Sequence, residues 1–292
     1  MQERDPREGP TPSLLNPQQA PPGTEEKLRP AADHGETSYQ GCGKLQGLAA
    51  VITGGDSGIG RAVALAFARE GADVAFGYIG EEETEDARET RRLVEEAGQR
   101  CLAERFDVGD AQACKAFVQR AHDTFGRLDI LVNNAAYQME QQGIEEITHE
   151  QLERTFRTNI FGYFFMVQAA LPFLKEGAVI LNTGSVTAME GNEGLIDYSA
   201  TKGAIHTFTK SLAASLAEKG IRVNCVAPGP VWTPLIPATL EPGHVRKFGK
   251  DTLWGRPAQP AEIAPSYVFL ASADARYYTG EVLAPTGKAT TR

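Results

Sequence analysis

The stretch LAAVITGGDSGIGRAVALAFAREGA, residues 48–72, decides the fold. Its first part, LAAVITG (48–54), is an apolar run that predicts a buried β-strand ending on glycine. A glycine-rich loop follows, and RAVALAFAREGA (61–72) has the apolar spacing of an amphipathic helix that Gly71 would stop. Glycines allow a tight turn, and the start of a helix offers free N–H groups to an anion. The stretch therefore predicts a strand, an anion-binding loop and a helix in succession.

The chain then alternates short strand-like runs with longer helical stretches. We predict further strands at 73–78, 101–108, 128–136, 177–185, 221–229 and 279–285, and further helices at 83–98, 111–126, 149–174, 197–220 and 260–272. Repeated strand–helix–strand units predict parallel strands joined by right-handed crossovers. We therefore predict a single α/β domain of the Rossmann type, with a doubly wound parallel sheet of about seven strands and helices on both faces.

Residues 1–45 differ from the rest, because they are rich in Pro, Gln, Glu and Gly and have almost no periodic apolar pattern. Such a segment does not fold alone. We expect 1–45 to be an extended N-terminal arm or a disordered tail, lying on the body or on a neighbouring subunit if it is ordered. Residues 46–292 then form the folded domain.

Composition excludes several classes of function. The net charge of −9 argues against nucleic-acid binding. No apolar run approaches the roughly 20 residues of a membrane helix, and the first residues lack the apolar core of a signal peptide. The four cysteines and five histidines have no metal-ligand spacing, which favours free thiols in a reducing compartment. We expect a cytoplasmic protein without a metal and without nucleic-acid or membrane partners.

In a doubly wound sheet, ligands bind at the carboxyl ends of the strands, where the strand order reverses. A glycine-rich loop between the first strand and the first helix of such a sheet indicates dinucleotide binding. The alternative at this point is a glycine-rich turn that binds no ligand.

The spacing TGxxxGIG at residues 53–60 differs from GxGxxG and resembles the short-chain dehydrogenase/reductase family. Further motifs agree with this family in order and spacing, from residue 45 to about 287. They are Asp107-Val108, Asn133-Asn134-Ala135-Ala136, Ser185 thirteen residues before Tyr198, Tyr198-x-x-x-Lys202, and Pro228-Gly229 followed by Val231-Trp232-Thr233. The arm and the GGDSGIGR loop are similar to a bacterial subgroup that resembles glucose/ribitol dehydrogenase and general-stress oxidoreductases.

Two residues on one predicted helix point to the chemistry. Tyr198 and Lys202 are four positions apart and so lie on one helical face. A phenol with an ordinary pKa of about 10 is a poor base at neutral pH, and we expect the lysine ammonium to lower the pKa of Tyr198. The resemblance implies that Tyr198 is the general acid/base, that Lys202 binds the nicotinamide ribose and that Ser185 holds the substrate oxygen. It also implies that Asn159 anchors a water that passes protons toward Lys202.

The resemblance further implies which residues bind the cofactor. They are Gly54, Asp56, Ser57, Gly58, Ile59, Gly60, Tyr78, Asp107, Val108, Asn133, Ala135, Tyr198, Lys202, Pro228, Gly229, Val231 and Thr233. Tyr78 stands where an NAD-selective acid would be, and Ser57 stands where many NADP-using relatives carry arginine. A 2′-phosphate could be reached by three arginines, Arg61, Arg88 and Arg91. The glutamates at 81–83 oppose a phosphate, so the cofactor is NADP or NAD, with a slight lean to NADP.

Residues 46–292 are thus the predicted dinucleotide-binding catalytic domain. We expect an NAD(P)-dependent oxidoreductase that interconverts an alcohol and an aldehyde or ketone by hydride transfer. The alternative is a non-catalytic dinucleotide-binding or regulatory protein on the same fold. Residues 232–251 are the predicted substrate lid. The family usually ends in two glycines where this chain has Gly287-Lys288. The resemblance also implies a homotetramer, formed by the helices that carry Asn159 and Tyr198.

Overall fold

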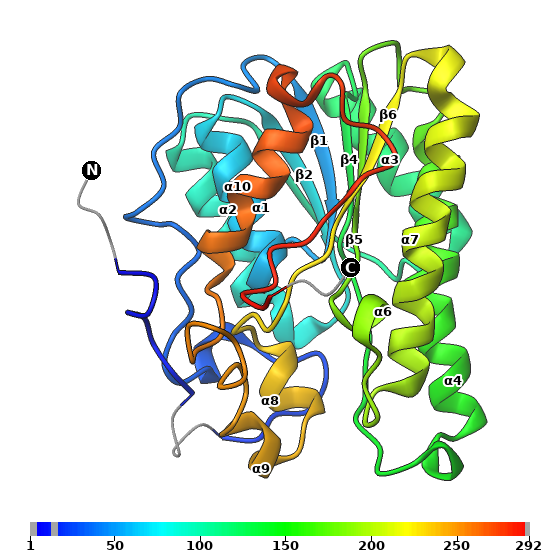
Figure 1. The fold of residues 1–292 in the computed structure, drawn as a ribbon. Helices are drawn as coiled ribbons and strands as arrows, with labels where there is room; N and C mark the ends of the chain where they lie inside the picture. The colour runs from blue at the N-terminus through cyan, green and yellow to red at the C-terminus, as the bar shows by residue number, and fades with distance from the viewer. Residues whose placement is uncertain (1–4, 13–16, 290–292) are drawn as a thin grey trace.

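The computed structural model describes residues 5–12 and 17–289, and the predicted fold class is confirmed. Seven parallel strands form one sheet in the order β3-β2-β1-β4-β5-β6-β7 (Figure 1). The strands are β1 (Ala49–Thr53), β2 (Asp73–Tyr78), β3 (Cys101–Arg105), β4 (Ile130–Asn133), β5 (Val179–Thr183), β6 (Arg222–Val226) and β7 (Val282–Leu283). Strand order reverses between β1 and β4, so ligands are expected at the carboxyl ends of these two strands.

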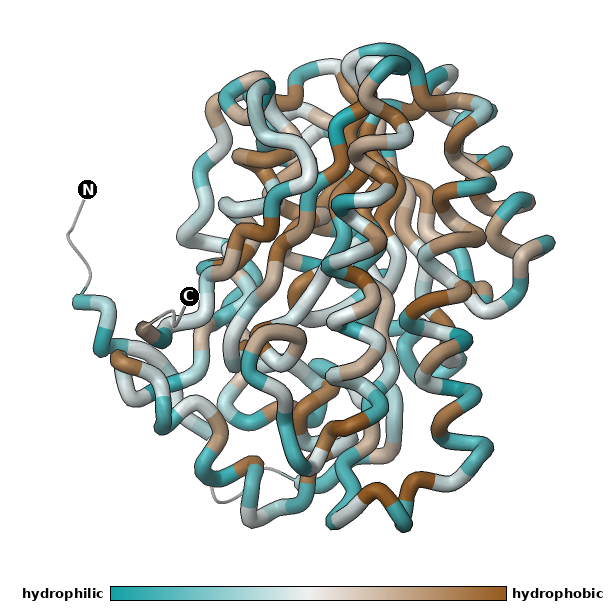
Figure 2. Tube along the Cα trace, turned by 45° about the vertical axis from the view of Figure 1, so that its right-hand side comes forward, coloured by the Kyte–Doolittle hydropathy of each residue, from teal (hydrophilic) through white to brown (hydrophobic). Residues whose placement is uncertain are grey.

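Helices cover both faces of the sheet. One face carries α1 (Gly58–Arg69), α2 (Thr84–Glu96) and α10 (Pro260–Ala271), and the other carries α3 (Ala111–Phe125), α4 (His149–Phe156), α5 (Gly162–Ala170) and α7 (Ile196–Leu216). Short helices α6 (Thr187–Glu190), α8 (Leu235–Thr239) and α9 (Pro242–Val245) lie at the carboxyl edge. Alternate residues of β1 serve the two layers, because Ala50 and Ile52 pack with α1 while Ala49 and Val51 pack with α3. Figure 2 shows the hydrophobic strands at the centre.

The prediction of one continuous helix over 149–174 is wrong. This stretch consists of α4, a π-helical segment (Arg157–Phe161) and α5, which ends at Ala170. Each π turn holds an extra residue, and such segments are frequent at functional sites. Asn159 lies in this segment and is completely buried. Residues 149–161 contain neither Pro nor Gly, so the sequence pattern gives no sign of the interruption.

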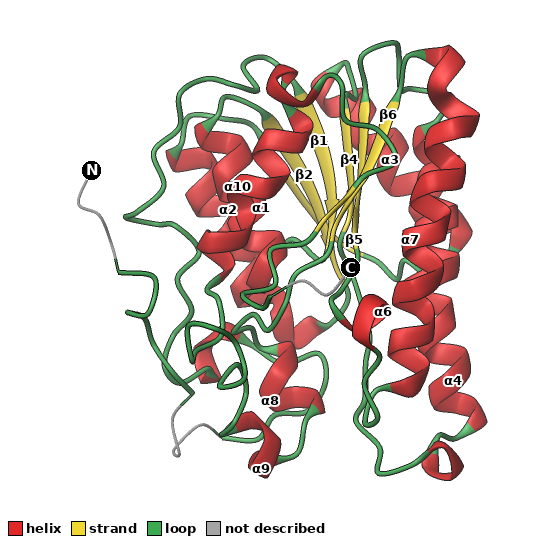
Figure 3. Ribbon diagram, in the orientation of Figure 1, coloured by secondary structure: helices red, strands yellow, loops and turns green. Residues whose placement is uncertain are grey.

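Several strands are shorter than predicted at their carboxyl ends. β4 ends at Asn133 instead of 136, β5 at Thr183 instead of 185, and β7 has two residues. The residues that leave the sheet become loops at its lower edge in Figure 3. Two of these loops are joined directly, since the backbone N–H groups of Asn134 and Ala135 donate to Thr53 Oγ1 at 2.9 and 3.0 Å.

The arm, where it is described over residues 17–45, lies against the body of its own chain. Arg69 of α1 donates to the carbonyl oxygens of Gly35, Glu36 and Tyr39. Leu28 is completely buried and packs with an apolar cluster that includes Trp232. The boundary between arm and domain at residue 45 stays a prediction. In residues 5–12 and 17–289, no helix has the length and apolar character to cross a bilayer.

Candidate active site

The glycine loop connects β1 to α1 at the reversal of strand order. Gly58 has φ of +49°, in the left-handed region that favours glycine. Gly60 packs so closely that a Cβ there would lie 1.8 Å from the carbonyl oxygen of Gly54. The loop therefore needs glycine for its path and for the close approach of α1 to β1. Its backbone and the start of α1 face a cavity.

Two cavities meet beside this loop. The first has about 210 Å³ and lies along the glycine loop, and the second has about 550 Å³ and lies under residues 232–251. Both are lined by the same five residues, Ile59, Thr183, Tyr198, Thr233 and Leu235. The two cavities thus form one cleft at the carboxyl edge, with Tyr198 at the junction. Its size suits a dinucleotide and a small second ligand.

Tyr198, Lys202 and Ser185 come together as the sequence predicts. Tyr198 and Lys202 lie on α7, and Ser185 follows β5 and hydrogen-bonds to Tyr198. The Lys202 ammonium is 1% exposed, donates to the Thr183 carbonyl oxygen at 2.7 Å and lies 5.3 Å from the centre of the Tyr198 ring. Ser185 Oγ also accepts from the N–H and hydroxyl of Thr187 at 3.1 and 3.0 Å, which orients it.

The pKa of Tyr198 differs from the sequence expectation in direction. Burial raises it to about 12, and the hydrogen bond from Ser185 opposes that rise. Burial also lowers the pKa of Lys202 to about 8. Burial thus favours the neutral form of both groups, and the lysine does not bring the pKa of this phenol below its ordinary value.

Asn159 is fixed on both sides. Its Oδ1 accepts from the Tyr137 N–H at 2.8 Å, and its Nδ2 donates to the Tyr137 carbonyl oxygen at 2.9 Å and to Thr201 Oγ1 at 3.0 Å. Asn159 therefore connects the loop after β4 to α7, where its partner Thr201 lies between Tyr198 and Lys202 in the sequence. The predicted role of Asn159 in holding a water stays a prediction.

Most predicted cofactor residues line the cleft. Along the first cavity lie Gly54, Asp56, Ser57, Gly58, Ile59, Tyr78, Val108, Ala135, Tyr198, Lys202 and Thr233, and along the second lie Pro228, Gly229 and Val231. Three line neither. Gly60 packs behind the loop, exposed Asp107 accepts from the Gly109 N–H, and buried Asn133 donates to Asn182 Oδ1 at 3.0 Å.

Other lining residues escaped the sequence analysis. Asn134 lines the cavity in place of Asn133, and its Nδ2 donates to the carbonyl oxygens of Thr53 and Gly54. The strand period of two does not single it out, because Asn134 follows the end of β4 and its neighbours Ala135 and Ala136 line the same cavity. The signal was the NNAA motif at 133–136 itself. Pro21 and Pro22 of the arm also line the first cavity, and no sequence motif marks them.

Acidic side chains stand where the adenosine ribose is expected. Asp56 and Glu83 line the first cavity with 2% and 5% exposure. Burial raises the pKa of Asp56 to about 6, and burial together with Asp56 raises that of Glu83 to about 8. Arg61 is occupied elsewhere, since it donates to the Asp56 carbonyl oxygen and to Thr90 and pairs with Asp86. The arginines at 88 and 91 pair with glutamates on the exposed face of α2.

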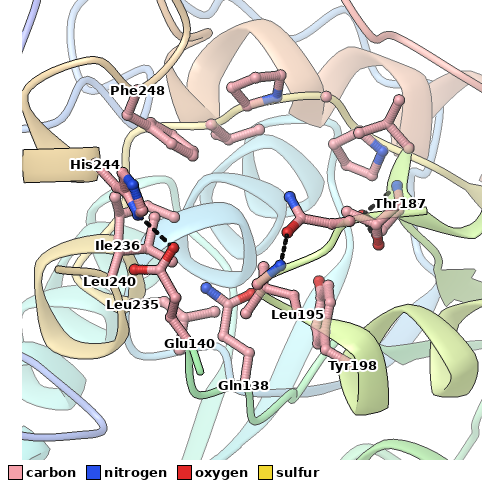
Figure 4. A pocket seen from close by; sticks show the side chains of 18 of the residues that line it. Gln138, Glu140, Thr187, Leu195, Tyr198, Leu235, Ile236, Leu240, His244 and Phe248 are labelled. Atoms are coloured by element: carbon pink, nitrogen blue, oxygen red, sulfur yellow. Dashed lines mark hydrogen bonds and ion pairs between the residues drawn. The ribbon is translucent and has the colours of Figure 1, made fainter. Parts of the chain in front are cut away.

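Residues 232–251 cover the second cavity, as the lid prediction requires (Figure 4). His244 Nδ1 lies 2.6 Å from Glu140 Oε1, which ties α9 to the loop after β4. Lys288 Nζ lies 2.7 Å from Asp251 Oδ2 and 3.2 Å from Glu190 Oε2. The residue that departs from the family ending thus connects one end of the lid to α6, across the cavity.

Comparisons with known proteins agree with this geometry. The family model described as enoyl-(acyl carrier protein) reductase matches residues 54–287. The chain is 56% identical to the uncharacterized oxidoreductase YhdF of Bacillus subtilis, over 91% of each chain. It is 50% identical to NADPH-dependent aldehyde reductase 1, chloroplastic, of Arabidopsis thaliana, over 93% of this chain and 96% of that one. It is 49% identical to glucose and ribitol dehydrogenase of Daucus carota, over 93% and 95%.

Solved structures give the same result. A short-chain dehydrogenase from Burkholderia cenocepacia in complex with NADP has a TM-score of 0.78 and 32% identity, over 84% of this chain and 98% of that one. A 3-ketoacyl-(acyl-carrier-protein) reductase from Brucella melitensis, complexed with NADH, has a TM-score of 0.74 and 32% identity, over 83% and 98%. The loop and cleft of this chain fit such a cofactor, NADP(H) or NAD(H). The chain belongs to the short-chain dehydrogenase/reductase family of oxidoreductases.

Proposed function

We propose that this protein interconverts an alcohol and an aldehyde or ketone by NAD(P)-dependent hydride transfer, with Tyr198 as general acid/base. The observation that carries the proposal is the position of Tyr198. It stands where the two cavities join, with Ser185 hydrogen-bonded to it and Lys202 beneath it. A group there reaches both a cofactor along the glycine loop and a substrate under the lid.

Tyr198, Ser185 and Lys202 have different roles in the proposed proton transfer. When bound, the nicotinamide ring supplies the hydride in reduction and accepts it in oxidation. In reduction, the Tyr198 hydroxyl gives its proton to the carbonyl oxygen as that oxygen gains charge, and in oxidation the phenolate takes the proton from the alcohol. Ser185 donates to the substrate oxygen and stabilises this charge. The raised pKa keeps Tyr198 protonated at neutral pH, as reduction requires, and the Lys202 ammonium stabilises the phenolate that remains after the proton has left.

We propose a small, polar and uncharged substrate. The second cavity presents amide groups from Gln138, Gln141 and Asn192, together with the ion pairs that tie down the lid. These groups favour a molecule with several hydroxyls over an apolar one. The names of the carrot and Arabidopsis relatives, a glucose and ribitol dehydrogenase and an aldehyde reductase, support a sugar-like alcohol or a small aldehyde.

The slight preference for NADP remains a prediction that the structure weakens. Asp56 and Glu83 face the expected ribose, and the two basic residues of the described lining, Arg154 and Lys202, lie on α4 and α7. An ionised Asp56 repels a 2′-phosphate and can accept from a 2′-hydroxyl. The name of the Arabidopsis relative favours NADPH. Steady-state rates with both cofactors decide the preference.

The proposed activity is tested by replacing Tyr198 with Phe. Wild type and Y198F are assayed against aldehydes and polyols with NADH and NADPH, and cofactor binding is measured on both. We expect a loss of at least about 10³-fold in kcat with the cofactor Kd changed less than about threefold. If wild type is as inactive as Y198F on the whole panel while the cofactor binds, the protein is the non-catalytic dinucleotide-binding alternative.

We also propose a homotetramer formed by α5, α7 and the π-helical segment. Phe161 and Phe164 are 47% and 44% exposed there, and Phe164 packs against Phe208 with tilted rings whose centres are 4.4 Å apart. An exposed apolar surface of this kind is typical of a subunit contact. Light scattering of wild type should give four times the chain mass, and F164E should give a smaller species. A monomeric wild type would refute the assembly.

A further inference from the structure

The N-terminal arm reaches the cofactor loop itself. In Figure 1 the arm passes the end of the molecule that holds α8 and then runs beside α2 toward the start of β1. We propose that the arm forms part of the dinucleotide site and contributes to cofactor affinity. Glu25 positions the loop through Gly58, and Pro21 and Pro22 form part of the cavity wall. This inference rests on dinucleotide binding and not on which substrate is turned over.

Glu25 connects the arm to two elements at once. Its Oε1 accepts from the backbone N–H of Gly58 at 2.8 Å, and its own N–H donates to Asp86 Oδ2 of α2 at 2.9 Å. The Glu25 side chain is 9% exposed. A carboxylate at the first residue of α1 also interacts favourably with the helix dipole. The loop is thus held from the arm side by a buried, charge-assisted hydrogen bond.

Gly58 is the residue through which this contact reaches the cavity. Its left-handed φ of +49° fixes an unusual turn, and a Cβ there would lie 2.9 Å from Thr233 Cγ2. Gly58 and Thr233 both line the first cavity. The loop at Gly58 therefore lies between Thr233 and Glu25, and loss of Glu25 frees it to move away from the cofactor.

His34 keeps Glu25 ionised. It is 3% exposed and bridges two carboxylates, with Nε2 at 2.8 Å from Glu25 Oε1 and Nδ1 at 3.0 Å from Glu36 Oε1. A buried carboxylate needs such a partner, because an unpaired charge in the interior is costly. All three residues belong to the arm, so the arm carries its own charge compensation.

The same arm is fastened to the lid. The Gln19 N–H donates to the Pro237 carbonyl oxygen of α8 at 3.1 Å, and Trp232 Nε1 donates to the Pro30 carbonyl oxygen at 2.8 Å. Between these points, Pro21 and Pro22 line the cavity and Glu25 meets the loop. The arm therefore extends from the lid to the glycine loop on one side of the cleft.

The test measures cofactor affinity of the full chain, independent of catalysis. Titrations with NADH and NADPH follow the Kd of wild type, E25A and E25Q, and of E26A as a matched control, since Glu26 is an exposed neighbour in the same short helix. Thermal unfolding and circular dichroism report the fold. We expect E25A to raise the Kd of the preferred cofactor at least about tenfold, E25Q less, and E26A less than twofold.

The outcomes separate positioning from plain stabilisation. If E25A and E25Q unfold at lower temperature yet bind cofactor within twofold of wild type, the arm only stabilises the domain and the inference is overturned. If E25A does not fold, E25Q decides, because glutamine retains an acceptor for Gly58 and loses only the charge. A weakened Kd in E25Q with an intact fold supports the inference even where no substrate is found. Wild-type affinity in E25Q then overturns it.

Discussion

Replacement of His34 by Gln should remove a large part of the pH dependence of stability above pH 6.5. Burial opposes a charge on His34, but Glu25 and Glu36 beside it outweigh burial and raise its pKa from 6.5 to about 9, while Arg61 opposes the rise weakly. The folded state therefore binds a proton more tightly than the unfolded chain. The contribution of protonated His34 to stability is complete below about pH 6.5 and is lost as the pH rises through about 9.

The size of this contribution follows from the two pKa values. At 1.36 kcal/mol for each pH unit, a change from 6.5 to about 9 corresponds to roughly 3 kcal/mol. His34 is almost fully buried, so screening by solvent reduces this value little. Glutamine has a similar length, can still hydrogen-bond to Glu25 and does not titrate.

Urea unfolding at pH 6 and pH 9.5 measures the effect, with both proteins at one concentration. Other groups titrate in this range, among them Lys202 and Glu83, and they contribute equally to wild type and H34Q. Wild type should therefore lose about 2–3 kcal/mol more than H34Q between the two pH values. Equal losses would show that His34 is not held as a cation, and the charge compensation of Glu25 would have to be abandoned.

Three further changes have defined outcomes. D56N removes the acid that faces the ribose and leaves the backbone contact of Arg61 in place. It should raise the ratio of kcat/KM for NADPH to that for NADH about tenfold. An unchanged ratio would show that Asp56 does not take part in cofactor selection. K288A unties the lid from α6, and should raise the substrate KM about two- to fivefold with the cofactor Kd unchanged, since partly exposed ion pairs contribute little. N159A leaves the buried Tyr137 backbone and Thr201 groups unsatisfied, and urea unfolding should show a loss of about 2–4 kcal/mol together with a reduced kcat.

The sheet and the placement of Tyr198 beside Lys202 were predictable because their signals are local. A strand that ends in TGGDSGIG fixes where α1 begins, and the i, i+4 spacing places Tyr198 and Lys202 on one face. The pKa of Tyr198 was not predictable in the same way. It depends on how completely the surrounding fold removes the phenol from water, and a spacing of four residues contains no information on that.

The arm shows the same limit at a larger scale. Its residues lack periodicity, so the pattern left open whether 1–45 is disordered or lies on a body. What orders it is a set of single contacts to residues far along the chain, such as Glu25 with Gly58, Pro30 with Trp232 and Leu28 with its buried cluster. Each contact is made by a residue type that is also common in disordered segments. Two charged residues at the end of α1 mark the arm as ordered. Arg69 donates to three carbonyl oxygens of the arm, and Glu70, the residue after α1, accepts from the Tyr39 hydroxyl. Charged residues at the end of the first helix are therefore the sequence signal to seek when a Pro-rich extension precedes a Rossmann domain.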